Sequence, residues 1–185
     1  MAKRSAEKTA GTGPARLWAP WRAAYVRAGR RGRRPCIFCF GRLSEKTQRA
    51  RLVLWADSAA SVMLNRYPYN NGHLMIAPRR HLASPELLRR EERQALAELV
   101  ALAVKRLGQA LLPDGFNVGA NIGAVAGAGF AGHFHWHVVP RWEGDTNFMP
   151  VVSATKVLSQ QLGESFALLA PLFRAPGAGE PPALQ

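Results

Sequence analysis

The sequence predicts an α+β domain built on an antiparallel sheet of about five strands, with one long helix and a C-terminal helix. Short β-type runs flank a single long stretch of helical spacing, and strict βαβ alternation is absent. At 185 residues and 48% hydrophobic, the chain is long enough for one domain with a substantial core. We therefore expect one domain over residues 15–174, between a polar disordered arm at 1–14 and a Pro/Gly-rich disordered tail at 175–185.

Three strands are predicted before the long helix. Residues 52–55 and 61–65 are short β-type runs, separated by a polar turn around Asp57 and Ser58. The turn cluster RYPYNNG follows, and HLMIAP, residues 73–78, continues as a third strand that its proline closes. The spacing of these runs predicts one side of the sheet.

The longest helix is predicted to begin after Ser84 and to end before the Pro-Asp-Gly breaker at 113–115. Ser84 is a suitable N-cap, Pro85 suits the first helical position, and Glu86 is favourable to the helix dipole. Apolar residues then keep helical spacing as far as the breaker, at Leu96, Leu99, Val100, Ala103, Leu107 and Leu111.

Two more strands and a second helix are predicted after the breaker. FNVGAN, residues 116–121, is the fourth strand, and GHFHWHVVP, residues 132–140, is the fifth. The second helix lies within residues 160–173. Strands around one long helix complete the α+β pattern.

The net charge of +13 is concentrated near the N-terminus. Residues 1–34 hold ten basic residues and one acidic residue, a net charge of +9. Such a basic head attracts polyanions, either nucleic acid or a phosphate-rich small molecule, but a solvated arm without a specific partner has the same composition. No apolar run long enough for a membrane span occurs, and no secretory signal is recognised, so we expect a cytoplasmic protein without membrane contact.

The two cysteines lie together in CIFC, as Cys36 and Cys39. Two intervening residues make too tight a loop for a structural staple and suit a metal site or a redox pair better. A pair of buried, inert thiols is the alternative. The sequence pattern by itself leaves these possibilities open.

The stretch HFHWHVVPRW places His133, His135 and His137 at alternate positions. In a strand these side chains share one face, while the apolar residues between them face the core, so the histidines are expected to face a cleft or solvent. The outer two are roughly 13 Å apart along a strand, whereas a zinc–nitrogen bond is only about 2 Å long. One metal ion therefore does not bind all three, and at least one imidazole has another task.

The remaining histidines, His73 and His81, lie at the two ends of the third-strand run. This clustering disfavours five scattered surface imidazoles. The loop at 121–132, NIGAVAGAGFAG, consists of small residues that let backbone N–H groups approach an anion. Beside imidazoles, such a loop indicates a phosphate site next to a nucleophile or a general acid. Serine-based and carboxylate-pair hydrolysis lack support, since no nucleophile-elbow motif occurs and acids are scarce near the histidines.

Two motifs resemble a known family. HFHWHVV resembles the histidine-triad (HIT) signature, His-φ-His-φ-His-φ-φ with φ hydrophobic, and LNRYPYNNGHLMIAPRRH resembles the upstream block of that family. The resemblance spans about residues 36–142. LWAPWRAAYV, the GAVAGAG loop and VVPRWEGDTNFMPV are similar to the branch of bacterial diadenosine tetraphosphate phosphorylases. The resemblance implies a HIT-like fold and nucleotidyl transfer through a nucleotidyl-histidine intermediate.

The resemblance assigns roles to particular residues. His135 would attack the α-phosphorus, and His137 and His73 would flank the phosphate as donors or proton shuttles. The substrate-binding residues it implies are Asn65 for the ribose, Asn121 and the backbone of Gly123, Gly127 and Gly129 for the phosphates, and Trp142 for stacking on adenine. A Trp142 that only packs against the C-terminal segment is the alternative. The loop also departs from the family, since Gly129, Phe130 and Ala131 replace the usual Gln and Ser or Thr, so backbone donors must substitute.

A structural zinc is also implied, because zinc-bearing relatives hold the metal with CxxC and two histidines. The corresponding residues are Cys36, Cys39, His81 and His133. Two sulfurs and two imidazole nitrogens suit a closed tetrahedral site. The five histidines then divide into two for zinc and three for chemistry.

Several functions stay open at the level of sequence. The first is phosphorolysis of diadenosine tetraphosphate, an adenine dinucleoside polyphosphate, with phosphate as acceptor, to ATP and ADP. The second is a HIT-type hydrolase of dinucleoside polyphosphates or nucleoside phosphoramidates that releases a nucleoside monophosphate. A hexose-phosphate uridylyltransferase is disfavoured because His137 stands where that branch has Gln. A zinc-stabilised nucleic-acid-binding module would leave three histidines without a role, so nucleic acid is not the expected partner. The resemblance also implies a homodimer.

Overall fold

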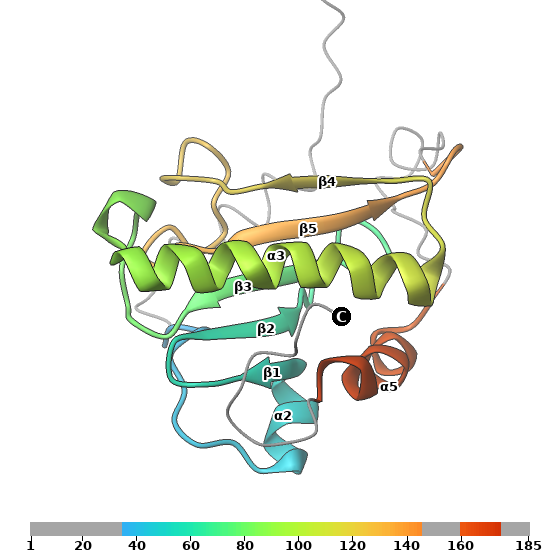
Figure 1. Ribbon diagram of the computed structural model, residues 1–185, viewed down its shortest axis with the longest axis horizontal. Helices are drawn as coiled ribbons and strands as arrows, with labels where there is room; N and C mark the ends of the chain where they lie inside the picture. The colour runs from blue at the N-terminus through green and yellow to red at the C-terminus, as the bar shows by residue number, and fades with distance from the viewer. Residues whose placement is uncertain (1–34, 146–159, 175–185) are drawn as a thin grey trace, which may run out of the picture.

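The computed structural model describes residues 35–145 and 160–174, and the predicted α+β fold is confirmed in them (Figure 1). The five strands form one sheet in the order β1-β2-β3-β5-β4, and every neighbouring pair is antiparallel. No helix of this described part is both long and apolar enough to cross a membrane. The predicted disordered ends, 1–14 and 175–185, lie outside the described residues. The elements in chain order are α2 (Glu45–Arg51), β1 (Val53–Ala56), β2 (Ala60–Leu64), β3 (Leu74–Pro78), the 3-10 helix η1 (Pro85–Leu87), α3 (Arg90–Leu111), β4 (Gly115–Gly119), β5 (Trp136–Arg141) and α5 (Leu162–Phe173).

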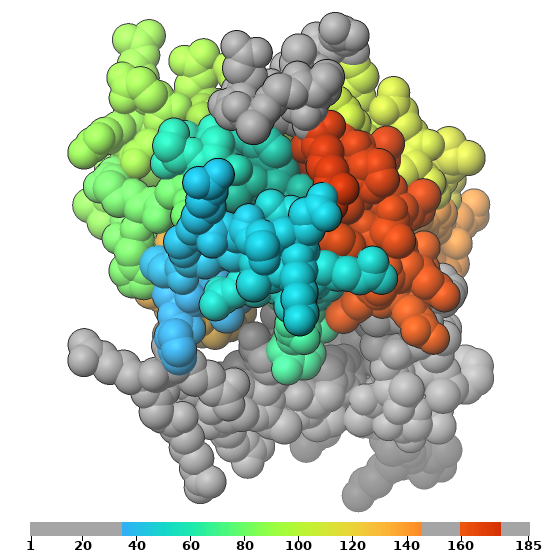
Figure 2. All heavy atoms as spheres, turned by 90° about the horizontal axis from the view of Figure 1, so that it is seen from below, coloured from blue at the N-terminus to red at the C-terminus, as the bar shows by residue number. Residues whose placement is uncertain are grey.

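The main core lies between one face of the sheet and helices α3 and α5. Figure 1 shows α3 crossing this face, and Figure 2 shows α5 beside α2 at the β1 end of the sheet. Each fully buried aliphatic or aromatic side chain there contributes about 1.5–3 kcal/mol through removal of apolar surface from water. The buried residues that α3 supplies to this core are Leu96, Leu99, Leu102, Ala103 and Leu107.

A second, smaller core covers the opposite face of the sheet. It consists of Phe38, Val53, Met63, Met75 and Ala77. Strands β2 and β3 are therefore buried along their whole length, on both faces. The segment that contains the two cysteines supplies the cover of this second face, which is also the face that carries the histidines.

The long helix begins later than the sequence predicts. Ser84 precedes only η1, and its side chain makes no capping bond to the backbone. Leu88 then adopts an extended conformation, with φ −70° and ψ 140°, and is buried in the main core. Helix α3 starts at Arg90, where Glu92 accepts a hydrogen bond of 2.8 Å from the backbone N–H of Arg89. The prediction of one helix from Ser84 is wrong because burying Leu88 interrupts it.

The strands near the histidines are also shorter than predicted. Strand β5 begins at Trp136, so His133 and His135 precede it. The backbone N–H of Phe134 donates to the carbonyl of Leu82, at 2.6 Å, instead of to strand β3. Strand β4 spans Gly115–Gly119, which leaves Asn121 in the following loop. The fifth-strand prediction is wrong at its start because the chain turns there toward Leu82.

Helix α2 is absent from the sequence prediction. None of its residues is buried, so no apolar periodicity marks it. Its start is marked only by Ser44, whose hydroxyl accepts a hydrogen bond of 3.4 Å from the backbone N–H of Thr47. The N-cap residue was the available signal.

The turn before His73 requires a glycine. Gly72 has φ +70°, and a Cβ at this position would lie 2.4 Å from Leu111 Cδ1. The buried Asn70 side chain donates to the carbonyl of Pro140, at 3.2 Å. The turn is thus held against α3 on one side and β5 on the other, and this fixes the position of His73.

Candidate functional site

The five histidines form two neighbouring groups in the described structure. His81 and His133 lie with the two cysteines, and we refer to these four residues as the metal cluster. The other group, the imidazole cluster, consists of His73, His135 and His137. The groups are joined by the short segment between His133 and His135.

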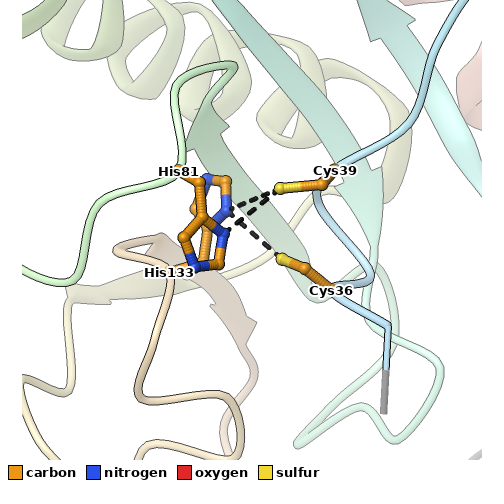
Figure 3. Close-up of side chains that lie close together, drawn as sticks. All are labelled: Cys36, Cys39, His81 and His133. Atoms are coloured by element: carbon orange, nitrogen blue, oxygen red, sulfur yellow. Dashed lines mark hydrogen bonds between the residues drawn. The ribbon is translucent and has the colours of Figure 1, made fainter. Parts of the chain in front are cut away.

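The metal cluster brings together three separate parts of the chain (Figure 3). Its four ligand atoms lie within 4.8 Å of one another. His133 Nδ1 lies 3.3 Å from Cys36 Sγ and 3.6 Å from Cys39 Sγ, and His81 Nδ1 lies 3.2 Å from Cys39 Sγ. With bonds of about 2.0–2.3 Å, the corners of a tetrahedral zinc site are roughly 3.5 Å apart. The spacing and the donor types both fit such a site.

The orientation of His133 also fits a metal ligand. Its Nε2 lies 2.8 Å from the carbonyl of Pro78, which only accepts hydrogen bonds, so Nε2 carries the proton. The lone pair is then on Nδ1, which faces the two sulfur atoms. Metal-bound histidines in proteins usually have the same second hydrogen bond to a carbonyl or carboxylate.

Burial shifts the pKa values of two residues in the metal cluster. It raises the pKa of the Cys36 thiol to about 11, and it lowers the pKa of His133. A thiol with a raised pKa is a poor nucleophile, which does not favour a reactive redox pair. Cys36 and Cys39 form no disulfide with each other.

The imidazole cluster contains a directed hydrogen bond. His73 Nδ1 accepts from the backbone N–H of Tyr69 at 3.0 Å and is 3.4 Å from Asn65 Nδ2, so the neutral His73 ring carries its proton on Nε2. That Nε2 lies 2.9 Å from His137 Nδ1 and donates to it. The neutral His137 ring then carries its own proton on Nε2. The backbone turn before His73 therefore determines the tautomers of two catalytic candidates.

His135 has the opposite arrangement. Its Nδ1 lies 2.8 Å from the carbonyl of His133, so Nδ1 carries the proton and Nε2 has the lone pair. Burial lowers the pKa of His135, which keeps the ring neutral near neutral pH. Its ring centroid is 4.8 Å from that of His137. A neutral imidazole with a lone pair at Nε2, beside an N–H donor, is the arrangement that nucleophilic attack on phosphorus needs.

Two of the three triad histidines are buried, whereas the sequence predicts that all three face a cleft or solvent. His133 and His135 are 1% and 5% exposed, not open to solvent. The cause is Phe38, which lies between the two cysteines and is itself fully buried. Its ring centroid is 5.1 Å from that of His133 and 4.7 Å from that of His135. Sequence reasoning missed Phe38, although its position inside CIFC was a signal.

The predicted substrate-binding residues come from the ends of β2 and β5 and from the loop before the triad. Asn65 follows β2 directly and lies beside His73. In the loop before the triad, Asn121 Nδ2 donates to the carbonyl of Gly127 at 3.4 Å. The backbone N–H groups of Gly127 and Ala128 are already bonded inside that loop. Trp142 follows β5 and is half-buried, with its backbone N–H donating to Asp145 at 3.1 Å.

The same loop has glycines where the backbone requires them. Gly123 and Gly127 have φ values of +81° and +89°, which L side chains rarely adopt. Gly123 and Gly129 are exposed, and Gly127 is half-buried. The loop thus has the conformation of a tight, glycine-dependent turn beside the triad.

A groove of about 440 Å³ extends from His137 along strands β4 and β5. It is lined on one side by Tyr69 and along its length by Asn117, Asn121 and Arg141. Sequence reasoning missed Tyr69, Asn117 and Arg141. The signal for Arg141 was its spacing, since residues 137, 139 and 141 share one face of a strand.

Comparison with known proteins identifies the family. A HIT domain model matches residues 46–144, more than half of the chain. The AP-4-A phosphorylase of Mycobacterium tuberculosis is 36% identical over 160 residues, which cover 84% of this chain and 82% of that protein. The adenosine 5'-monophosphoramidase of Schizosaccharomyces pombe is 31% identical over 109 residues, which cover 57% of this chain and 74% of that protein.

A solved structure agrees with the fold. The hypothetical histidine triad nucleotide-binding protein of Sulfolobus tokodaii superposes with a TM-score of 0.53 at 27% identity, over 65% of this chain and 79% of that chain. Its fold, the matching family model and the two motifs around the imidazole cluster lead to one conclusion. The chain belongs to the HIT domain family.

Proposed function

We propose that this protein transfers an adenylyl group from diadenosine tetraphosphate to inorganic phosphate, through a covalent intermediate on His135. Its relatives named as a phosphorylase and a monophosphoramidase are enzymes, and this chain is an enzyme of the same HIT family. The observation that carries the proposal is the tautomer of His135. Its Nδ1 proton is held by the carbonyl of His133, so Nε2 has the lone pair that attacks.

The reaction has two displacements at the same phosphorus. His135 Nε2 attacks the α-phosphorus, the bond to the bridging oxygen breaks, and ATP leaves. The Nε2 proton of His137, whose ring is held by His73, goes to the leaving oxygen. An oxygen of inorganic phosphate then attacks the adenylyl-histidine and gives its proton to His137 Nε2, the phosphorus–nitrogen bond breaks, and ADP leaves. Neutral His135 is restored.

The other roles inferred from the sequence belong to the same proposal. Asn65 binds the ribose of the adenylyl group, since it lies beside His73 at the end of β2. Asn121 and the loop glycines, Gly123, Gly127 and Gly129, border the phosphates, and Trp142 stacks on an adenine. Two loop N–H groups are bonded internally, so the loop binds phosphate with its remaining donors.

Phosphate is the proposed acceptor because the AP-4-A phosphorylase matches over 84% of this chain. The alternative is hydrolysis, in which water attacks the same intermediate and AMP is released. It is supported by the monophosphoramidase, which matches a smaller part of the chain. Both reactions use His135 in the same way, and they differ only in the second attacking group.

We further propose that the metal cluster binds a structural zinc ion. The support is the donor set of two sulfurs and two imidazole nitrogens, with His133 Nδ1 held toward both thiols. When bound, the metal would cross-link three segments of the chain and supply no step of the chemistry. We also propose a homodimer, for which the support is that β4 is an edge strand of the described sheet and can pair with a second copy. The cytoplasmic location expected from the sequence remains part of the same proposal.

The decisive experiment incubates the protein with diadenosine tetraphosphate, with and without radiolabelled inorganic phosphate, and separates the nucleotides. We expect ATP and ADP only when phosphate is present, with the label in the β-phosphate of ADP. His135→Ala is the matched control and should form neither product. AMP and ATP without phosphate would identify a hydrolase, and no turnover under either condition would contradict the proposed function.

A further inference from the structure

We propose that the groove beside His137 binds the leaving polyphosphate of the substrate, and that Arg141 is the residue that holds it. The ligand class is a linear chain of phosphates attached to the adenylyl group that His135 receives. This inference rests on the proposed function and adds to it the site of the leaving group.

The groove exists because of the strand register. His137, Val139 and Arg141 point to the same face of β5. Opposite His137 and Arg141, strand β4 has Gly119 and Gly115. A Cβ added at either glycine would meet no atom within 4 Å, so the face above these two side chains is open. The face therefore leads from His137 to Arg141 past Val139 and, opposite it on β4, Asn117, over roughly 13 Å of strand.

Arg141 is held in a fixed position in this groove. Its Nε and Nη2 donate to the two carboxylate oxygens of Asp145, each at 2.6 Å, and its Nη1 donates to Asn117 Oδ1 at 2.7 Å. A guanidinium has about five N–H donors. These bonds use three of them, which leaves two for an anion in the groove. A fixed planar guanidinium is well suited to bidentate binding of phosphate oxygens.

Asp145 does not cancel this role. Its carboxylate also accepts from Asn70 Nδ2 at 2.9 Å and from the backbone N–H of Trp142 at 3.1 Å. The Asp145 side chain is 8% exposed, whereas that of Arg141 is 41% exposed. The carboxylate therefore lies behind the guanidinium and orients it, while the guanidinium faces the groove.

The sheet order separates the two halves of the substrate. Asn65, at the end of β2, lies beside His73 on one side of the imidazole cluster. The groove lies on the other side, over β5 and β4. A dinucleoside polyphosphate bound with its adenylyl ribose at Asn65 and its α-phosphorus at His135 extends its leaving arm past His137 toward Arg141. In an in-line displacement the leaving oxygen lies opposite the attacking His135 Nε2, so the leaving arm then points away from His135.

The test compares two substrates that differ only in the leaving arm, diadenosine tetraphosphate and the p-nitrophenyl ester of AMP. The main variant is Arg141→Met combined with Asp145→Asn, which removes both charges and so avoids a buried carboxylate that has lost its arginine partner. We expect kcat/KM for diadenosine tetraphosphate to fall at least about tenfold more than kcat/KM for the ester. Arg141→Lys, which keeps the charge without the fork, should show a smaller difference in the same direction.

Arg90→Ala is the matched control, since it removes one positive charge at the start of α3, outside the groove. This variant should change kcat/KM for both substrates by the same factor. Equal losses of kcat/KM for the two substrates in the Arg141 variants would overturn the proposal. The proposal would also be overturned if tripolyphosphate inhibited the wild type and the Arg141→Lys variant with the same inhibition constant. This measurement needs only a folded lysine variant. Failure of the proposed function is distinct, because it shows in the wild type alone, which would then turn over neither substrate or would release AMP from diadenosine tetraphosphate without phosphate.

Discussion

The metal cluster and the imidazole cluster lie next to each other, but they are held in different ways. The metal cluster joins the CIFC loop, the residue His81 after β3 and the residue His133 before β5, none of which is in a helix or strand. The imidazole cluster has His137 inside β5 and His73 directly before β3. Sheet register and backbone hydrogen bonds therefore position the imidazoles, whereas the residues of the metal cluster come from loops and would be cross-linked by the proposed ion.

His135 links the two clusters, and this link makes the comparison testable. Its proton is held by the carbonyl of a metal-cluster residue, His133, and its ring packs on Phe38 between the two cysteines. Loss of the metal should therefore loosen the nucleophile without removing it. Loss of an imidazole should stop the chemistry and leave the metal in place.

The largest expected effect comes from two separate alanine variants, at two alternate residues of one short segment. His135→Ala should lower kcat by at least about 10³-fold, because the nucleophile is lost, while zinc content and Tm stay near those of the wild type. His133→Ala should instead cause loss of zinc and a lower Tm. Kinetics, elemental analysis and thermal unfolding on both variants check this. Normal zinc content in His133→Ala would end the division into two clusters.

The next effect concerns the relay to the leaving oxygen. His73→Ala removes the donor that holds His137 Nδ1, so we expect kcat to fall by about 10²-fold, the usual range for one group in acid–base catalysis. Zinc content should not change. His73→Gln, which keeps a side-chain donor, should recover part of the loss. Equal activity of the two variants would contradict a hydrogen-bonding role.

Removal of the metal should have a smaller effect on chemistry than on stability. Cys39→Ser replaces a sulfur atom that is close to both histidines, and zinc affinity should fall at least about 100-fold. Chelator treatment of the wild type should lower Tm in the same direction. Because the imidazole cluster keeps its own hydrogen bonds, residual phosphorolysis should remain measurable at low temperature. Unchanged Tm after verified zinc removal would contradict a structural role.

The smallest effect is a shift in pH dependence. Burial lowers the pKa of His135 below its ordinary value of about 6.5. The neutral ring is the nucleophile, so kcat/KM should be full above this lowered pKa and lost as the pH falls through it. Phe38→Leu should expose the ring slightly and move this acid limb up toward about 6.5, at a cost of roughly 1 kcal/mol in stability.

Phe116→Leu is the control for that shift, since Phe116 packs against the main core on the other face of the sheet. It should lower stability without moving the acid limb. If the acid limb of the kcat/KM profile lay at the same pH in the wild type and in Phe38→Leu, Phe38 would not set the environment of His135.

The difference between prediction and structure has a physical pattern. The strands, the long helix and the α+β class follow from apolar periodicity and turn residues, which are local properties of the chain. The boundaries that differ involve long-range packing, since Leu88 interrupts the long helix by entering the core and Phe134 bonds to Leu82 instead of to β3. Helix α2 has no buried residue, so periodicity had nothing to detect.

The sequence by itself determined which residues are candidates for the chemistry, because imidazoles, thiols and small loop residues in these motifs have few other uses. It also determined the family, through the histidine spacing and the Gly-His block. Only the tertiary structure decided the tautomers of His73, His135 and His137, since each depends on a carbonyl or N–H group brought from another residue. It alone also decided that Phe38 buries the nucleophile and that two glycines of β4 leave a groove leading to Arg141. The packing of Phe38 on His135 and the pairing of β4 with β5 join segments that are distant in the sequence, so no local pattern encodes them.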